Sequence, residues 1–139
     1  MCEETKKVLI TVKAYPNPSR KYSETVCVAG IDVDNRQWVR LYPIPFRDLD
    51  KDKRFKKYSI IQAKVVKARD DMRLESYKVN IYSIKILDYF DTKDKWTRRK
   101  NIVLSNVDKS MCDILRRSKT EDRYWHRYPR NRKGNRGYC

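Results

Sequence analysis

The stretch from Glu24 to Leu49, ETVCVAGIDVDNRQWVRLYPIPFRDL, constrains the fold more than any other part of this chain. It contains two β-strand patterns, Glu24–Ile31 and Gln37–Tyr42. The polar segment Asp32–Arg36 between them predicts a hairpin. The chain therefore contains an antiparallel strand pair early in its sequence.

The second strand of this pair has two distinct sides. Val39 and Leu41 point to one side, which suits a hydrophobic core. Three larger side chains share the other side, namely Trp38, Arg40 and Tyr42. One side of this strand is therefore expected to face the core, and the other side is a candidate ligand-binding surface.

Further strands are expected at Lys7–Tyr15, Ser59–Arg69 and Ser83–Leu87. The first is expected to be half-buried, with Val8, Ile10, Val12 and Ala14 on its apolar side. A break is expected near Asn80–Ser83, where the apolar phase slips. Pro43 and Pro45 are expected to end the Gln37–Tyr42 strand, because proline cannot donate to a ladder. The charged connection 46–58 predicts a loop or short helical turns with two apolar anchors, Leu49 and Phe55.

Helical patterns come late in the chain. Asp91-Thr92 can cap a helix that carries Trp96, Lys100 and Val103. Ser105 or Asn106 can cap a second helix. Its apolar stripe consists of Val107, Met111, Ile114 and Leu115.

These elements predict a mainly β protein with C-terminal helices, built as a small curved sheet or OB-like β-barrel with a helical flank. At 139 residues the chain is long enough for one core. The expected organisation is a barrel over 1–90, a helical flank over 91–118 and an irregular basic tail over 119–139.

The charge balance points to a polyanionic partner. The chain has 34 Lys and Arg against 18 Asp and Glu, a formal charge of +16. Such an excess favours nucleic acid, either single-stranded DNA or RNA. The absence of a long apolar run or a basic amphipathic helix argues against a membrane partner, and the charged start of the chain does not resemble a secretory signal. A cytoplasmic protein is expected.

Cysteine and histidine usage predicts neither a metal site nor a cofactor. The four cysteines are scattered without a CxxC pair, and His126 is the single histidine. Cys27 and Cys112 lie in apolar patterns that suit buried free thiols. Because no recognisable catalytic constellation accompanies them, the sequence favours a protein without enzymatic activity.

Aromatic and basic residues meet in three candidate binding clusters, the combination that single-strand binders use for stacking and phosphate contact. The first cluster consists of Trp38, Arg40 and Tyr42. The second consists of Arg69, Arg73 and Tyr77. The third consists of Lys95, Trp96, Arg98, Arg99 and Lys100. Each aromatic ring could instead serve as packing or cover.

Several segments together resemble a known bacterial family. They are KVLITVKAYPNPSRKYSETVCVAGI, RQWVRLYPIPFRDL, FKKYSIIQAKVVK, DMRLESYKV and SIKIL followed by KWTRRKNIVL. Over about Lys7–Asp122 this pattern is similar to the dual OB-containing domain. The resemblance implies an OB-like barrel associated with nucleic acid and no defined reaction. It also implies that this chain supplies about the first half of such a protein.

Other functions are compatible with the same residues. A small basic ribonuclease of the toxin kind could use the Arg98-Arg99-Lys100 cluster, although no general base is recognisable. A PUA-like module would also bind RNA. A third possibility is a protein-interaction subunit of a bacterial defence or nucleic-acid-processing complex.

The tail Arg123–Cys139 contains six basic residues and no acid. It is consistent with a basic arm that contacts phosphates. A second hypothesis is that it results from reading the message out of frame, since a one-base shift can restore the glycine-threonine turn and acidic stretch that follow a Glu-Asp pair in the resembled family. Without the tail the formal charge would be +10.

Overall fold

The structure is a computed structural model that describes residues 2–20, 23–71, 73–107 and 109–120. It is mainly β, with two short helices near the C-terminal end, as predicted. The seven strands are β1 (Glu4–Lys13), β2 (Asn17–Ser19), β3 (Ser23–Asp32), β4 (Trp38–Ile44), β5 (Ser59–Lys67), β6 (Ser76–Val79) and β7 (Lys85–Tyr89). The two helices are α1 (Lys93–Val103) and α2 (Met111–Thr120).

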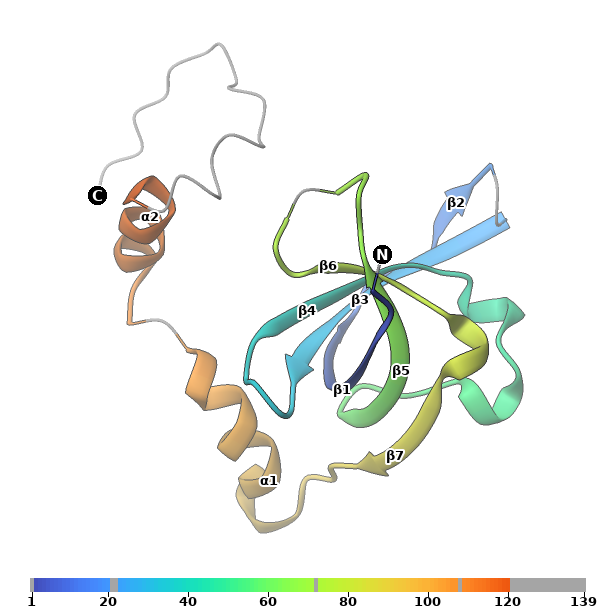
Figure 1. Cartoon of the computed structure of the whole chain (residues 1–139). Coiled ribbons are helices and arrows are strands. Elements are labelled where there is room, and N and C mark those ends of the chain that lie inside the picture. The colour runs from blue at the N-terminus through green and yellow to red at the C-terminus, as the bar shows by residue number, and fades with distance from the viewer. Residues whose placement is uncertain (1, 21–22, 72, 108, 121–139) are drawn as a thin grey trace. The chain divides into compact units, whose positions relative to one another are not determined.

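Five of the strands close into a barrel (Figure 1). The order around the ring is β1-β3-β4-β6-β5, and β5 pairs back onto β1. All pairs are antiparallel except β4 and β6, which run parallel. Counted along the chain, these strands close in the order 1-2-3-5-4-1, which is an OB-like arrangement.

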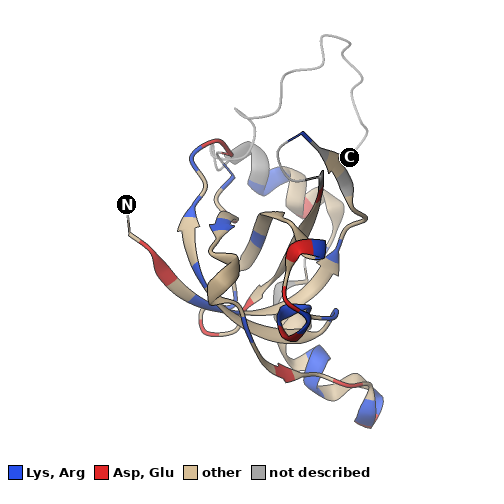
Figure 2. Ribbon diagram, turned by 90° about the vertical axis from the view of Figure 1, so that its right-hand side faces the viewer, with Lys and Arg blue, Asp and Glu red and all other residues tan. Residues whose placement is uncertain are grey.

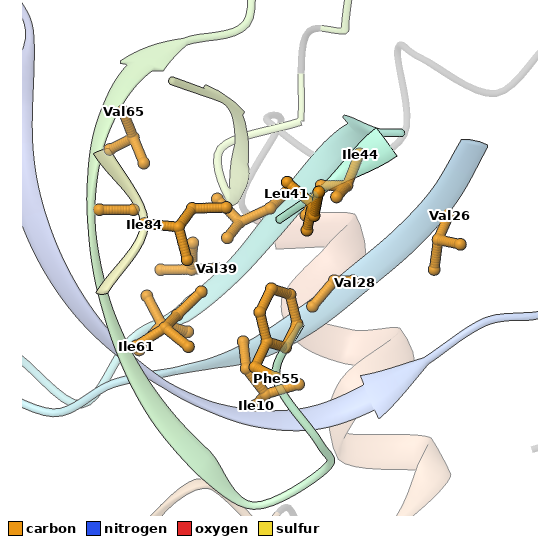
Figure 3. Packing of buried hydrophobic residues seen from close by; sticks show 13 residues of the cluster. Ile10, Val26, Val28, Val39, Leu41, Ile44, Phe55, Ile61, Val65 and Ile84 are labelled. Atoms are coloured by element: carbon orange, nitrogen blue, oxygen red, sulfur yellow. The ribbon is translucent and has the colours of Figure 1, made fainter. Parts of the chain in front are cut away.

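Alternating side chains fill the barrel. Figure 3 shows residues from several strands and the connecting segments converging on one core, among them Val39, Leu41 and Phe55. The connection between β4 and β5 forms two 3-10 turns, Phe46–Asp48 and Lys51–Lys53. Its anchors Leu49 and Phe55 are buried, as expected from the sequence.

A second apolar cluster lies on the outside of the barrel. Leu9 of β1 and Ile31 of β3 face each other in register and are fully buried. Phe90 and Ile102 cover them, so the segment after β7 and helix α1 pack on this side. Burial on both sides explains why these strands contain apolar residues at consecutive positions.

Glycine is required at position 30, where β3 approaches its neighbour β1 most closely. A Cβ atom on Gly30 would lie 2.2 Å from the carbonyl oxygen of Leu9. This separation is far below van der Waals contact, so any side chain at this position would push the two strands apart.

Two local expectations need correction, and a third is confirmed. Strand β4 does not end before Pro43 but continues to Ile44, because its pairing with β3 resumes at Val26. In β1 a bulge after Ile10 reverses the alternation, and Val12 is exposed instead of buried. The described break between β6 and β7, a 3-10 turn at Ile81–Ser83, confirms the predicted interruption.

The helices also differ from their sequence patterns. Asp94, Lys95 and Trp96 have left-handed backbone with φ between 50° and 65°, so the right-handed part of α1 follows them. Neither Ser105 nor Asn106 caps α2, because 104–106 is a separate 3-10 turn. The cap is Ser110, whose hydroxyl accepts a hydrogen bond from the backbone N–H of Asp113 at 3.1 Å.

The chain divides into two compact units, 1–106 and 107–139, so the division falls after α1. No helix in the described ranges is both long enough and apolar enough to cross a membrane. The hypotheses about the tail concern residues 123–139, which lie outside the described residues.

Candidate nucleic-acid interface

The outer side of β4 carries the first predicted cluster. Trp38 is 45 % exposed and Tyr42 is 37 % exposed, whereas Val39 and Leu41 point into the core. Arg40 lies between the two rings, with its guanidinium carbon 4.9 Å from the centroid of the Tyr42 ring. The predicted division of this strand is therefore confirmed, with two accessible rings on either side of a cation.

The connection between β5 and β6 joins this surface through Asp71. The Asp71 carboxylate contacts Nη1 of Arg40 at 2.7 Å and Nε of Arg73 at 3.0 Å. It also accepts a hydrogen bond from the hydroxyl of Ser76 at 2.8 Å. The backbone N–H of Arg40 donates to the carbonyl of Glu75 at 2.6 Å, so β4 and this connection are held together by side chains and backbone.

The contacts around Asp71 keep it ionised. Partial burial alone would raise the pKa of this carboxyl, but hydrogen bonds from Arg73 and Ser76 hold the pKa of Asp71 well below its usual range. The Asp71 carboxylate thus links Arg73 to Arg40, whose guanidinium lies beside the Tyr42 ring. We name the set Trp38, Arg40, Tyr42, Asp71 and Arg73 the β4 face.

The second predicted cluster is divided by the fold. Arg73 lies at the β4 face, and Arg69 is exposed in the same β5–β6 connection. Tyr77 instead is half-buried against the barrel core, and the ammonium groups of Lys6 and Lys67 lie 5.1 and 5.0 Å from its ring centroid. The structure therefore joins Arg73 to the first cluster and separates Tyr77 from it.

In the third cluster, two arginines attach α1 to the barrel. Arg98 forms an ion pair with Asp88, and its guanidinium carbon lies 4.1 Å from the Phe90 ring centroid. Arg99 donates from Nε to the carbonyl of Phe90 at 2.8 Å and covers the Tyr58 ring at 3.8 Å. These contacts give Arg98 and Arg99 a structural role in this conformation.

The remaining members of the third cluster are solvent-exposed. They are Lys95, Trp96 and Lys100. Ile102, and not Trp96, inserts into the apolar cluster under α1. Trp38 lies opposite Ile31 in the β3–β4 register, and Ile102 of α1 packs in the same apolar cluster as Ile31. Helix α1 therefore lies next to the Trp38 end of the β4 face.

Sequence reasoning missed Asp71, which organises the β4 face. The local signal was present, since Asp70 and Asp71 separate Arg69 from Arg73 in a basic chain. Its connection to Arg40, however, spans 31 positions and depends on the parallel pairing of β4 with β6.

The barrel unit, residues 1–106, is basic. Residues 1–106 have a formal charge of +10, while the Lys and Arg of 107–122 balance its Asp and Glu. Figure 2 shows Lys and Arg distributed over many elements of this unit, interspersed with fewer acidic residues. The β4 face is therefore one aromatic surface on a broadly basic body.

Among the described residues, no three His, Cys, Asp or Glu side chains come together as a metal site. Cys2 and Cys27 are free thiols, and Cys27 is half-buried in β3. His126 lies outside the described residues.

Fold and surface together define a small basic OB-like barrel protein with an aromatic outer face. The chain belongs to the family described as Domain of unknown function (DUF8758), which it matches over residues 4–105. The match ends where the barrel unit ends. Comparison with curated proteins and with solved structures found no significant match. None of these findings bears on the resemblance to the dual OB-containing domain.

Proposed function

We propose that the barrel unit binds single-stranded nucleic acid through its β4 face, without catalysing a reaction. The observation that carries this proposal is the pair of exposed rings, Trp38 and Tyr42, with Arg40 between them on one strand. Aromatic rings stack on any base, and neighbouring cations neutralise the phosphates that connect the bases.

The spacing of the rings suits an extended strand of nucleotides. Trp38 and Tyr42 are four positions apart along β4, a distance of roughly 13 Å at about 3.3 Å per residue. Two stacked bases with the cation of Arg40 between them fit this length. Arginine carries five N–H donors, and the one that Arg40 gives to Asp71 leaves others for a phosphate.

The position of the face in the barrel also supports the proposal. OB-folds bind oligonucleotides on their second and third strands and on the loops that follow the first and fourth strands. Here the second and third strands of the ring are β3 and β4. The loop after the fourth ring strand is the β5–β6 connection that carries Arg69, Asp71 and Arg73.

Titration of fluorescently labelled 20-mers tests the proposal, using single- and double-stranded DNA and RNA at two salt concentrations. If Arg40, Arg69 and Arg73 neutralise about three phosphates, log K falls by about 0.7 per phosphate for each decade of salt. Affinity for single strands should then fall roughly 20-fold between 50 and 200 mM salt. Intact oligonucleotide after prolonged incubation separates binding from the ribonuclease alternative.

Substitutions locate the site. Trp38→Ala and Tyr42→Ala should each weaken binding by at least about fivefold, because stacking contributes about 1–3 kcal/mol per base. Tyr82→Ala is the matched control, since Tyr82 is the more exposed ring and lies in the turn between β6 and β7. Equal affinity of all three folded variants would place the site elsewhere, and no binding at 50 mM salt would reject the function.

A further inference from the structure

Strand β7 is an open edge with apolar side chains. It pairs only with β5 among the described strands and lies outside the closed ring (Figure 1). All five of its residues are exposed, although Ile86, Leu87 and Tyr89 are large and apolar. The 3-10 turn Lys51–Lys53 lies near β7 but leaves these side chains accessible. An exposed apolar edge of this kind is a template for pairing with another strand.

Leu87 is the most prominent residue of this edge. The register of β5 passes from Ile86 to Asp88, so Leu87 has no partner on β5. It therefore forms a bulge, with 48 % of its surface exposed. This exposed surface can be buried by association.

We propose that β7 is a dimerisation surface and that its partner is β7 of a second copy, running antiparallel. A two-fold axis at Leu87 brings the two leucines together. It also brings Lys85 of each copy opposite the second copy's Tyr89, a cation–π pairing. The same patch thus serves both copies, as a two-fold interface requires.

The charge distribution favours β7 as the contact between two basic bodies. The barrel unit has a formal charge of +10, but β7 contains one lysine and one aspartate and is neutral. Asp88 also pairs with Arg98 of α1, so the edge and this arginine together carry one net positive charge. Repulsion between copies is therefore small at this edge and is screened by salt beyond about 8–10 Å.

Sedimentation velocity of the full chain under reducing conditions, after nuclease treatment, tests this dimer. The expected result is a mass that rises with concentration from 16.9 kDa towards twice that value. Association should be unchanged or stronger at 0.5 M than at 0.1 M salt, because screening reduces repulsion between the copies. Hydrogen exchange of the 85–89 amides should slow as concentration rises.

Leu87→Lys should raise the dimer dissociation constant at least tenfold, because it places like charges opposite each other across the axis. Val12→Lys is the matched control, since Val12 is also a strand residue and also 48 % exposed. A monomer at all concentrations would overturn the dimer. Three other results would also overturn it. Folded Leu87→Lys could associate as strongly as wild type, both variants could lose association equally, or association could require nucleic acid. The β4 face is not involved, so this result is independent of the proposed function.

Discussion

Replacing Asp71 by asparagine tests the network that holds β4 to the β5–β6 connection. Asparagine keeps the shape but loses the charge that binds Arg40 at 2.7 Å and Arg73 at 3.0 Å. Hydrogen bonds to charged groups contribute about 1.5–3 kcal/mol, and exposed ion pairs only about 0–1 kcal/mol. With 22 % of the Asp71 side chain exposed, we expect an intermediate loss of about 1–2 kcal/mol. For a unit of this size the Tm should fall by about 5–10 °C.

The effect of Asp71→Asn should depend on pH in a defined direction. The pKa of Asp71 is depressed in the folded state, so its stabilisation is complete above the unfolded-state pKa of about 3.9. Below that pH the unfolded chain takes up a proton first, and the stabilisation falls by about 1.4 kcal/mol per pH unit. The stability difference between wild type and variant should therefore be constant from pH 7 to 5 and shrink by about 1 kcal/mol at pH 3.

Thermal unfolding and urea unfolding, both followed by circular dichroism at pH 7, 5 and 3, measure the Tm and this difference in unfolding free energy. Asp70→Asn is the matched control, because the neighbouring Asp70 is 70 % exposed and contacts only Lys78 among the ion pairs of the described residues. The control should unfold like wild type at pH 7. A Tm of Asp71→Asn within 1 °C of wild type, or a difference that persists at pH 3, would refute the assigned role of Asp71.

Two further substitutions test the packing of the barrel unit. Gly30→Ala should lower the unfolding free energy by about 3 kcal/mol or more, because the new methyl group meets the carbonyl of Leu9. Urea unfolding close to that of wild type would contradict the close approach of β1 and β3. Arg99→Ala should cost about 2 kcal/mol by removing the hydrogen bond to Phe90 and the ring contact, while exposed Lys100→Ala should change stability by less than about 0.5 kcal/mol. Equal thermal unfolding of these two variants would show that Arg99 does not attach α1.

Local patterns in the sequence were sufficient for much of the fold. The period-two alternation around Arg40 predicted a strand with Val39 and Leu41 inside and Trp38 outside, because neighbouring residues of a strand point to opposite sides. The slip of phase near Asn80 predicted the break between β6 and β7 for the same reason. These features depend only on residues that are close in the chain.

Tertiary structure decided the features that depend on distant residues. The parallel pairing of β4 with β6 brings Asp71 to Arg40 across 31 positions. The packing of α1 buries Leu9 and Ile31 on the outside of the barrel and engages Arg98 and Arg99 in holding the helix. A local pattern indicates which side of a strand is apolar. It does not indicate which element covers that side or which acid pairs with a given arginine, because those contacts depend on how the barrel closes.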